Sequence, residues 1–406
     1  MSTLTSLGAA DLRAVISGYA DALAAHREVI NRLNVYPVPD GDTGTNMALT
    51  LASVAAELDG ADADLASVCA AIAHGSLMGA RGNSGVILSQ ILRGLSFGIR
   101  DADAEGRAVD GAVFATSLAA AAEAAYGAVG RPVEGTILTV VRVAAEHAVA
   151  AADGGADLLA TVEAAHLGAT EALASTPDLL PVLRDAGVVD SGGTGLVLLF
   201  DVALHVIDGR DVPDAPLDTE GASAEFIAAF DAAHEHGDGS LASLRYEVMF
   251  LLDAPDSSIV GFKDVWATLG DSIVVVGGEG LWNCHIHTDD IGPCIEAGIE
   301  VGRPRSIRIT DLLEELADVE EERWVREATP MAPEPSIVHE PVPCAVVAVS
   351  VGDGVRRIFH SLGVQVVVTG GQTMNPSTAQ LLEAVESAPA DDVVLLPNNK
   401  NIIPVA

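Results

Sequence analysis

A long series of helical segments occupies the first half of the chain and limits the fold more than any other feature. Apolar residues recur at helical spacing between Leu12 and Leu23. Similar segments follow near 46–58, 64–76, 82–99, 111–128, 135–151, 156–174 and 192–207. The loops between them are rich in Gly and Asp, and no convincing strand precedes residue 207. We therefore predict an all-α domain of about eight helices over residues 1–208.

The pattern changes after residues 209–240, a segment rich in Asp, Pro, Ala, Gly and His that we interpret as a linker, with room for one short helix around 226–233. Over 241–325 the sequence predicts strands at 246–252, 272–276, 281–287 and 306–309, helices at 258–268 and 291–301, and a charged helix at 310–323. The order βαββαβ is typical of a two-layer α+β domain of the ferredoxin-like kind.

A proline-rich second linker is predicted at 326–342, before a third unit at 343–406. Strands at 345–350, 365–369 and 392–396 alternate there with helices at 354–362 and 376–387. This alternation predicts a parallel sheet. Three strands make a thin sheet, so we expect an incomplete α/β domain.

The stretch NVYPVPDGDTGTNM, residues 34–47, is the first candidate site. It places Asp40 and Asp42 two residues apart in a tight turn. Pro37 and Pro39 stiffen the approach by fixing φ, and Gly41 permits backbone conformations that a Cβ would oppose. Carboxylates on such a turn suit Mg²⁺, which takes oxygen ligands and usually also holds substrate phosphates.

The short side chains after the turn leave two interpretations open. Thr43, Thr45 and Asn46 can add oxygen ligands, or the turn can be an ordinary Asx turn that caps the next helix at Thr45 or Asn46. The formal net charge of −37 bears on this choice. An acidic chain binds a nucleotide only if metal ions offset the repulsion between carboxylates and phosphates, so the charge fits a Mg²⁺-dependent site.

A Gly-rich turn at 79–85, GARGNSG, precedes an apolar helix and is a candidate phosphate site. Gly82, Asn83, Ser84 and Gly85 can present backbone N–H groups and a hydroxyl to phosphates at the helix N-terminus. The same residues could form a simple Gly-rich helix cap. The turn is not a Walker loop, because GxxxxGK[ST] does not occur in the sequence.

Two histidines form a third candidate site. His285 and His287 flank Ile286 on a predicted strand, so their side chains lie on one face and could chelate Zn²⁺. Two histidines hydrogen-bonded at a sheet surface would give the same pattern. Cys284 should point to the opposite face, and the four scattered cysteines show no disulfide spacing.

Five blocks in one order carry a family resemblance: PVPDGDTGTNM, GARGNSGVILSQ, AGVVDSGGTG, HIHTDD and GQTMNPST. From about Leu12 onward the chain resembles the nucleotide-binding domain of the dihydroxyacetone kinase superfamily. Within it, the chain is most similar to the ATP-binding subunit of bacterial fatty acid kinase. The resemblance implies an antiparallel eight-helix barrel with the nucleotide at one mouth, and a longer C-terminal domain than 343–406 provides.

The resemblance also implies roles for individual residues of the barrel. Asp40 and Asp42 would hold Mg²⁺. In the wider superfamily three acidic positions hold two metal ions, and the first of them falls near Asn34, an amide. The turn that contains Asp190 and Gly192 would close the pocket near the ribose and base, and Thr136 would lie in a loop at the same mouth.

In the middle domain, the resemblance implies that a cysteine on an earlier strand completes the site of His285 and His287. Glu247 occupies that position here, and a carboxylate can replace a thiolate on zinc. Residues 371–378 fall in the region that would engage an acyl-carrying partner. They could form an anion-binding turn or a cap with Pro376 at the first helical position.

These observations predict an ATP- and Mg²⁺-dependent phosphotransferase subunit. It would transfer the γ-phosphate to a fatty acid carboxylate held by a separate lipid-binding carrier, within phospholipid metabolism, with the nucleotide pocket inside 12–207. A carboxylate is already ionised at pH 7, so no general base is required. The alternatives are a kinase subunit for dihydroxyacetone (glycerone), which would need a base, and a nucleotide-binding regulatory protein without transfer activity.

Charge and hydropathy exclude other classes of function. The net charge of −37 argues against a nucleic-acid partner and against unaided docking on anionic membranes. The N-terminal residues do not resemble a signal peptide, and we find no apolar run of the roughly 18 residues that span a bilayer. We expect a cytoplasmic protein, and a homodimer through the middle domain is a further possible assembly.

Overall fold

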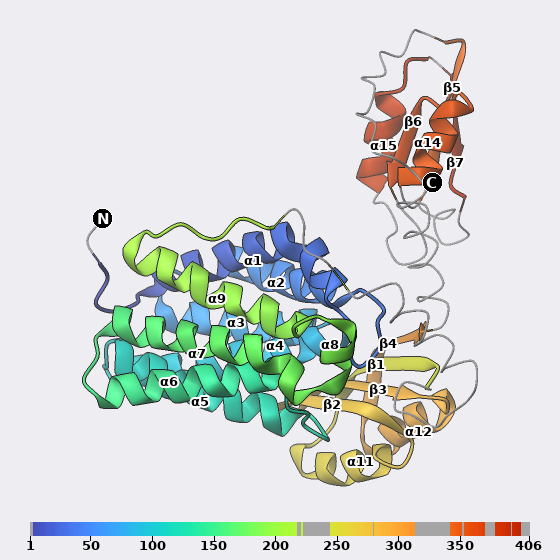
Figure 1. Ribbon diagram of the computed structural model, residues 1–406. Helices are drawn as coiled ribbons and strands as arrows, with labels where there is room; N and C mark the ends of the chain where they lie inside the picture. The colour runs from blue at the N-terminus through green and yellow to red at the C-terminus, as the bar shows by residue number, and fades with distance from the viewer. Residues whose placement is uncertain are drawn as a thin grey trace. The chain divides into compact units, whose positions relative to one another are not determined.

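The computed structural model describes residues 3–216, 221, 244–278, 280–312, 342–350, 353–369, 378–390 and 392–398. The chain divides into two compact units, Met1–Glu315 and Leu316–Ala406, and each is described by itself. The first unit contains a helical part and a sheet, and the second contains a smaller sheet (Figure 1).

Nine helices make up the helical part within the described residues. They are α1 (Ala9–Arg32), α2 (Thr43–Asp59), α3 (Leu65–Gly79), α4 (Gly82–Ala104), α5 (Gly111–Ala128), α6 (Ile137–Asp153), α7 (Leu158–Leu179), α8 (Pro181–Ala186) and α9 (Ser191–Asp208). The eight long helices match the predicted ones. The sequence pattern missed α8, because six residues span less than two helical turns and show no periodicity.

The long helices close into a ring around one apolar core. Each of α1 to α7 contacts the next helix, and α9 contacts both α7 and α1, so the ring is complete (Figure 1). Large side chains such as Tyr19, Met47 and Phe200 are fully buried inside it. The predicted helical barrel is therefore confirmed.

Acidic caps explain where several of these helices begin. Asp64, Asp110, Asp157 and Asp190 each stand immediately before a helix. Their carboxylates accept a hydrogen bond from the backbone N–H three residues further on, at 2.7 to 3.1 Å. Such caps satisfy N–H groups that have no partner inside the helix.

A four-stranded antiparallel sheet completes the first unit, in the order β2-β3-β1-β4. Its elements are β1 (Tyr246–Asp253), the 3₁₀ turn Asp256–Ser258, α11 (Ile259–Trp266), β2 (Gly270–Gly278), β3 (Leu281–Thr288), α12 (Ile291–Val301) and β4 (Arg303–Asp311). The order βαββαβ and the strand arrangement confirm the predicted α+β domain. One face packs on α11 and α12 through a core that includes Phe250, Phe262 and Trp266.

The opposite face of this sheet packs against the helical part. Met249, Val274 and Val276 form an apolar cluster with residues of α3 and α4, including Leu77 and Val86. Polar contacts reinforce the junction: the Asn283 amide donates to the Leu77 carbonyl at 3.2 Å. The sheet therefore lies between the helical part on one face and α11 and α12 on the other.

The second unit is a small parallel α/β layer. Its elements are β5 (Cys344–Ser350), α14 (Asp353–Ser361), β6 (Val366–Thr369), α15 (Thr378–Glu386) and β7 (Asp392–Leu396). The strand order is β6-β5-β7, and both pairings are parallel, as predicted. Val349 and Leu381 are buried between sheet and helix.

Several sequence predictions lie outside the described residues: the short helix at 226–233, most of the charged helix at 310–323, and the turn before α15. One expectation needs correction. Among the described helices, α9 is long and apolar enough to cross a membrane, although no such run was expected from the sequence. It is 67% buried inside the protein, as is usual for the core helix of a globular domain.

Candidate functional site

Four helix N-termini gather at one end of the helical part. The Ser84 hydroxyl, on α4, lies 3.4 Å from the Thr43 hydroxyl at the start of α2, and the Ser191 hydroxyl, on α9, lies 3.3 Å from the same atom. α6 adjoins them, because a Cβ on Gly192 would lie 3.2 Å from the Cβ of Ile137. A helix N-terminus carries partial positive charge and N–H groups without a partner inside the helix, so this end of the ring suits an anion.

The acidic turn lies at this end, directly before α2. The side-chain amide of Asn34 donates to Asp40, and that of Asn46 donates to Asp42 at 2.6 Å. Gly41 has φ of 68°, a conformation that favours glycine. Asp42 stands at the N-cap of α2, but within the described residues its carboxylate accepts no capping hydrogen bond from the N–H groups of the first turn. The turn therefore holds Asp40 and Asp42 side by side without using both carboxylates as caps.

The sheet brings a third carboxylate to this turn. Burial, and next the charge of Glu247 on β1, raise the pKa of Asp42 to about 6. Burial also raises the pKa of Glu247 itself. Carboxylates that share a partly desolvated site repel each other, and a bound cation relieves that repulsion. The approach of the middle sheet to the acidic turn was not predicted from the sequence.

The Gly-rich turn before α4 lies against the same residues. Gly82 has φ of 54°, and a Cβ at this position would lie 2.3 Å from the amide nitrogen of Asn46. A Cβ on Gly85 would lie 2.4 Å from the hydroxyl of Thr50. Both glycines are therefore required for α4 to approach α2. Asn83 has a buried side-chain oxygen with no hydrogen-bond partner in the described residues, as expected of a group that awaits a ligand.

Two other predicted residues at this mouth are helix caps. The Thr136 hydroxyl accepts the Leu138 N–H at 3.4 Å and starts α6. Asp190 accepts the Gly193 N–H at 2.7 Å, and burial raises the pKa of its carboxyl to about 6. Contacts of Thr136, Asp190 or Gly192 with a nucleotide remain predictions.

The remaining predicted residues of the turn have local partners. The hydroxyl of Thr45 accepts a hydrogen bond from the Asn31 amide at 3.0 Å, and its N–H donates back to Asn31 at 3.1 Å, so Thr45 ties α2 to α1. Asn31 was missed because it lies outside the motif. α2 begins at Thr43, so the interpretation that Thr45 or Asn46 caps it is wrong. Asn34 is buried and faces Asp40 through its amide nitrogen, so its role as a metal ligand remains a prediction.

Glu247, His285 and His287 converge on β1 and β3, with all their ligand atoms within 4.8 Å of one another. The two histidines are 0% and 5% exposed. Neither ring nitrogen of His285 has a hydrogen-bond partner among the described residues, and its Nδ1 lies 3.4 Å from Glu247. Burial lowers the pKa of His285 to about 3 and that of His287 to about 4, so both rings are neutral, the form that binds metals.

This geometry does not match two histidines hydrogen-bonded at a sheet surface. A buried imidazole without partners is costly, and a metal ion would satisfy it. Two neutral imidazoles and a carboxylate are a donor set that zinc accepts, with a fourth position left for another ligand. Cys284 points to the opposite face, into the core shared with α11 and α12, as predicted.

Two arginines near the acidic turn were not among the predicted site residues. Arg81 stands at the N-cap of α4, inside the Gly-rich motif, and Arg308 lies on β4. The predicted phosphate ligands of this motif were Gly82, Asn83, Ser84 and Gly85, and Arg81 was not among them. Only the folded sheet brings Arg308 near, so its position could not be inferred from the sequence.

Comparison with known proteins covers nearly the whole chain. Residues 37–205 match the DAK2 domain, 243–319 match the FakA-like middle domain of fatty acid kinase, and 345–406 match the FakA-like C-terminal domain of fatty acid kinase. The chain is 38% identical to Protein YloV of Bacillus subtilis (strain 168), over 100% of its own length and 72% of that protein. It is 36% and 35% identical to uncharacterized proteins of Staphylococcus aureus strains bovine RF122 / ET3-1 and MRSA252, over 96% of its length and 69% of theirs.

Proposed function

Since the chain belongs to the FakA-like fatty acid kinase family and carries that family's DAK2 domain, we propose that it is the ATP-binding, phosphoryl-donating subunit of a fatty acid kinase. The acceptor is the carboxylate of a fatty acid held by a separate lipid-binding protein. The observation that carries this proposal is the convergence of Asp40 and Asp42 with the N-termini of α2 and α4. Anionic oxygens for a cation and N–H groups for phosphates are what phosphoryl transfer asks of a protein.

The residues divide the work by charge. Asp40 and Asp42 hold Mg²⁺, and the turn from Gly82 to Gly85 holds the phosphate chain. Bound Mg²⁺ neutralises charge on the phosphates. A carboxylate oxygen of the fatty acid bonds to the γ-phosphorus, the bond from that phosphorus to the β,γ-bridging oxygen breaks, and ADP leaves with the electron pair. No proton moves, because the acceptor carboxyl is ionised at pH 7.

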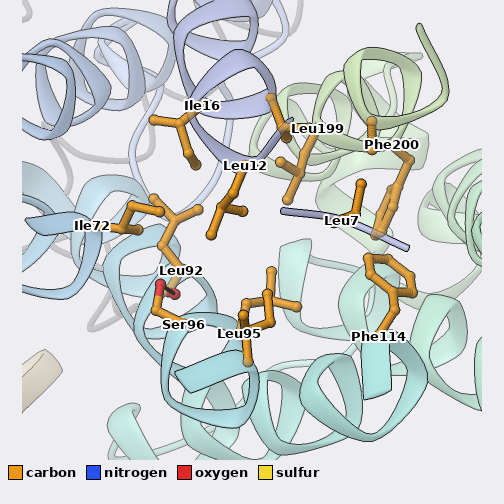
Figure 2. Close-up of a pocket in the computed structure, with 13 residues that line it drawn as sticks. Leu7, Leu12, Ile16, Ile72, Leu92, Leu95, Ser96, Phe114, Leu199 and Phe200 are labelled. Atoms are coloured by element: carbon orange, nitrogen blue, oxygen red, sulfur yellow. Dashed lines mark hydrogen bonds between the residues drawn. The ribbon is translucent and has the colours of Figure 1, made fainter. Parts of the chain in front are cut away.

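The helical core supports an external carrier for the acyl chain. It contains an apolar cavity of about 50 Å³, lined by residues such as Leu12, Leu92 and Phe114 (Figure 2). A cavity of this size holds a few water molecules or a small group. This small cavity is consistent with presentation of the fatty acid by another protein, which is part of the proposal. Such a carrier fits an enzyme of the cytoplasm, and we propose that this chain is cytoplasmic.

A direct test is to incubate the protein with ATP, Mg²⁺ and a fatty-acid-loaded carrier, and to trap the acyl phosphate with hydroxylamine. Wild-type protein should form acyl hydroxamate and ADP in equal amounts. Asp40→Ala and Asp42→Ala should each lower the rate at least about 100-fold, because each removes charge compensation at the transferring group. Asp59→Ala, at the exposed end of α2, is the matched control and should be unaffected.

The outcomes separate the alternatives. Near-normal rates in both turn variants would contradict the proposed site. ADP formation with dihydroxyacetone on a partner protein, and none with the fatty acid carrier, would support glycerone kinase activity instead. Nucleotide binding without transfer to either acceptor would indicate a regulatory protein.

We further propose that Glu247, His285 and His287 hold a Zn²⁺ ion in the middle sheet. The support is the buried imidazole of His285, whose two ring nitrogens have no hydrogen-bond partner among the described residues. Protein purified without added metal should contain about one zinc per chain by elemental analysis, and His285→Ala should contain far less. His26→Ala is a control, because His26 is also buried but bonds the Ala22 carbonyl at 2.9 Å. Equal zinc in wild type and His285→Ala would place the metal elsewhere.

A further inference from the structure

The strand register places Arg308 on the face of the sheet that meets the helices. Arg308 on β4 stands opposite Met249 on β1, and residues directly opposite in an antiparallel pair share one face. Met249 packs with Leu77 and Ala80 at the junction of α3 and α4. Arg308 therefore lies on the edge strand next to that junction, where Figure 1 shows β4 beside β1.

Arg81 is the next residue after Ala80, so the two guanidinium groups come from opposite sides of one junction. The Nε of Arg81 is buried and has no hydrogen-bond partner in the described part of the chain. The two guanidinium groups interact electrostatically: burial, and next the charge of Arg308, lower the pKa of Arg81. Most described arginines pair with a carboxylate, as Arg305 does with Asp253 at 2.6 Å. Arg81 is half-buried, and Arg308 lies exposed on the edge strand. Two neighbouring guanidinium groups repel each other, and a bound anion relieves that repulsion.

The neighbours of this arginine pair indicate which anion. Arg81 immediately precedes Gly82 at the N-terminus of α4, the proposed phosphate turn. On the other side, Glu247 is two residues from Met249 on β1 and on the same face, so it is a diagonal neighbour of Arg308. Asn46, whose amide would meet a Cβ on Gly82, donates to Asp42 of the acidic turn. The pair thus lies between the phosphate turn and the acidic turn, on the side covered by the sheet. Guanidinium groups bind phosphate oxygens bidentately, and two of them match the several oxygens of a terminal phosphate.

Building on the proposed function, we infer that Arg81 and Arg308 together bind the terminal phosphate of the nucleoside triphosphate, one arginine from the helical part and one from the middle sheet. The β- and α-phosphates are left to the turn from Gly82 to Gly85 and to Mg²⁺. The site therefore distinguishes a triphosphate from a diphosphate through a residue outside the DAK2 domain. Transfer of the γ-phosphate removes the group that the pair holds, which favours release of ADP.

The test measures the affinities of the full-length protein for ATP and ADP, each with Mg²⁺, by titration calorimetry. Arg308→Ala should lower the affinity for ATP at least about tenfold, because charge-assisted hydrogen bonds to one phosphate are lost. The affinity for ADP should change by less than about twofold. The ATP affinity of Arg308→Lys should lie between those of wild type and Arg308→Ala, since lysine keeps the charge but lacks the planar set of donors of a guanidinium group. Arg305→Ala, on the same strand and outside the site, should leave both affinities unchanged.

Equal weakening of ATP and ADP, or none of either, would overturn the inference. Unchanged ATP affinity with a raised KM for the loaded carrier would also overturn it, since the pair would then bind the acceptor carboxylate. Wild-type protein that binds neither nucleotide would instead overturn the proposed function.

Discussion

At the scale of single residues, the candidate site is built from carboxylates in unusual surroundings. Asp42, Asp190 and Glu247 all lie where burial raises the pKa of a carboxyl group. They differ in what else they do. Asp42 lies on a turn between two helices and has Glu247 as a charged neighbour, as a metal ligand would, whereas Asp190 satisfies a helix N-terminus.

Replacement of Asp190 by Asn should therefore stabilise the nucleotide-free protein at neutral pH. The folded-state pKa of about 6 exceeds the unfolded value near 3.9, so the folded state binds more protons between these values. The contribution of Asp190 to wild-type stability then falls as pH rises from about 4 to 6, by roughly 3 kcal/mol at most. Asn caps a helix as well as Asp does but does not titrate. Part of the gain is offset by the lost attraction between the carboxylate and the helix dipole.

The measurement is the free energy of urea unfolding at several pH values. Asp190→Asn should match wild type near pH 4 and exceed it by about 1 to 2 kcal/mol above pH 7. Asp157→Asn, at the exposed cap of α7, should show almost no difference at any pH. A constant difference across the range, or lower stability at pH 7, would contradict this account of Asp190.

At the scale of helices and strands, close approach of α1, α2 and α4 creates the site. A Cβ on Gly44 would lie only 2.3 Å from the Arg27 carbonyl oxygen, so the first turn of α2 packs directly on α1. Gly82 and Gly85 in the same way let the first turn of α4 pack closely on α2. These contacts hold the acidic turn and the Gly-rich turn against each other.

Gly44→Ala should destabilise the protein by about 1 to 3 kcal/mol and weaken nucleotide binding, because α2 must move away from α1. Gly127→Ala is the matched control, since a Cβ there would meet nothing within 4 Å on the exposed side of α5. It should stabilise the protein by about 0.5 to 1 kcal/mol. Urea unfolding followed by circular dichroism measures both, and equal effects of the two substitutions would show that the close approach does not matter.

Helix and strand positions could be predicted well because the signals are local. Apolar residues at helical spacing indicated the long helices, and the order of strand and helix segments indicated both sheets. The contact between Glu247 and the acidic turn could not be predicted, because periodicity shows that a face is buried and not which surface covers it. For the same reason Arg308 went unnoticed, although the motif that contains Arg81 was identified.

At the scale of the whole molecule, the helical part and the middle sheet act as one unit around the site. They form the compact unit Met1–Glu315 and share the apolar cluster around Met249. From the sequence, the nucleotide pocket was expected inside 12–207. The sheet adds Glu247 and Arg308 at its border, so we propose that the middle domain covers the site as well as engaging a partner. The chain's net charge of −37 favours a cation at this border when a nucleotide binds.

The central claim is that the turn of Asp40 and Asp42 binds nucleotide through Mg²⁺, and titration of ATP into the full-length protein tests it most directly. With Mg²⁺, wild type should bind ATP. Chelation of Mg²⁺, or Asp42→Asn, should weaken binding at least about tenfold, because the carboxylate and the phosphates would then lack their shared cation. Asp59→Asn should behave as wild type. ATP binding that is equally tight without Mg²⁺, or equally tight in Asp42→Asn, would contradict the account.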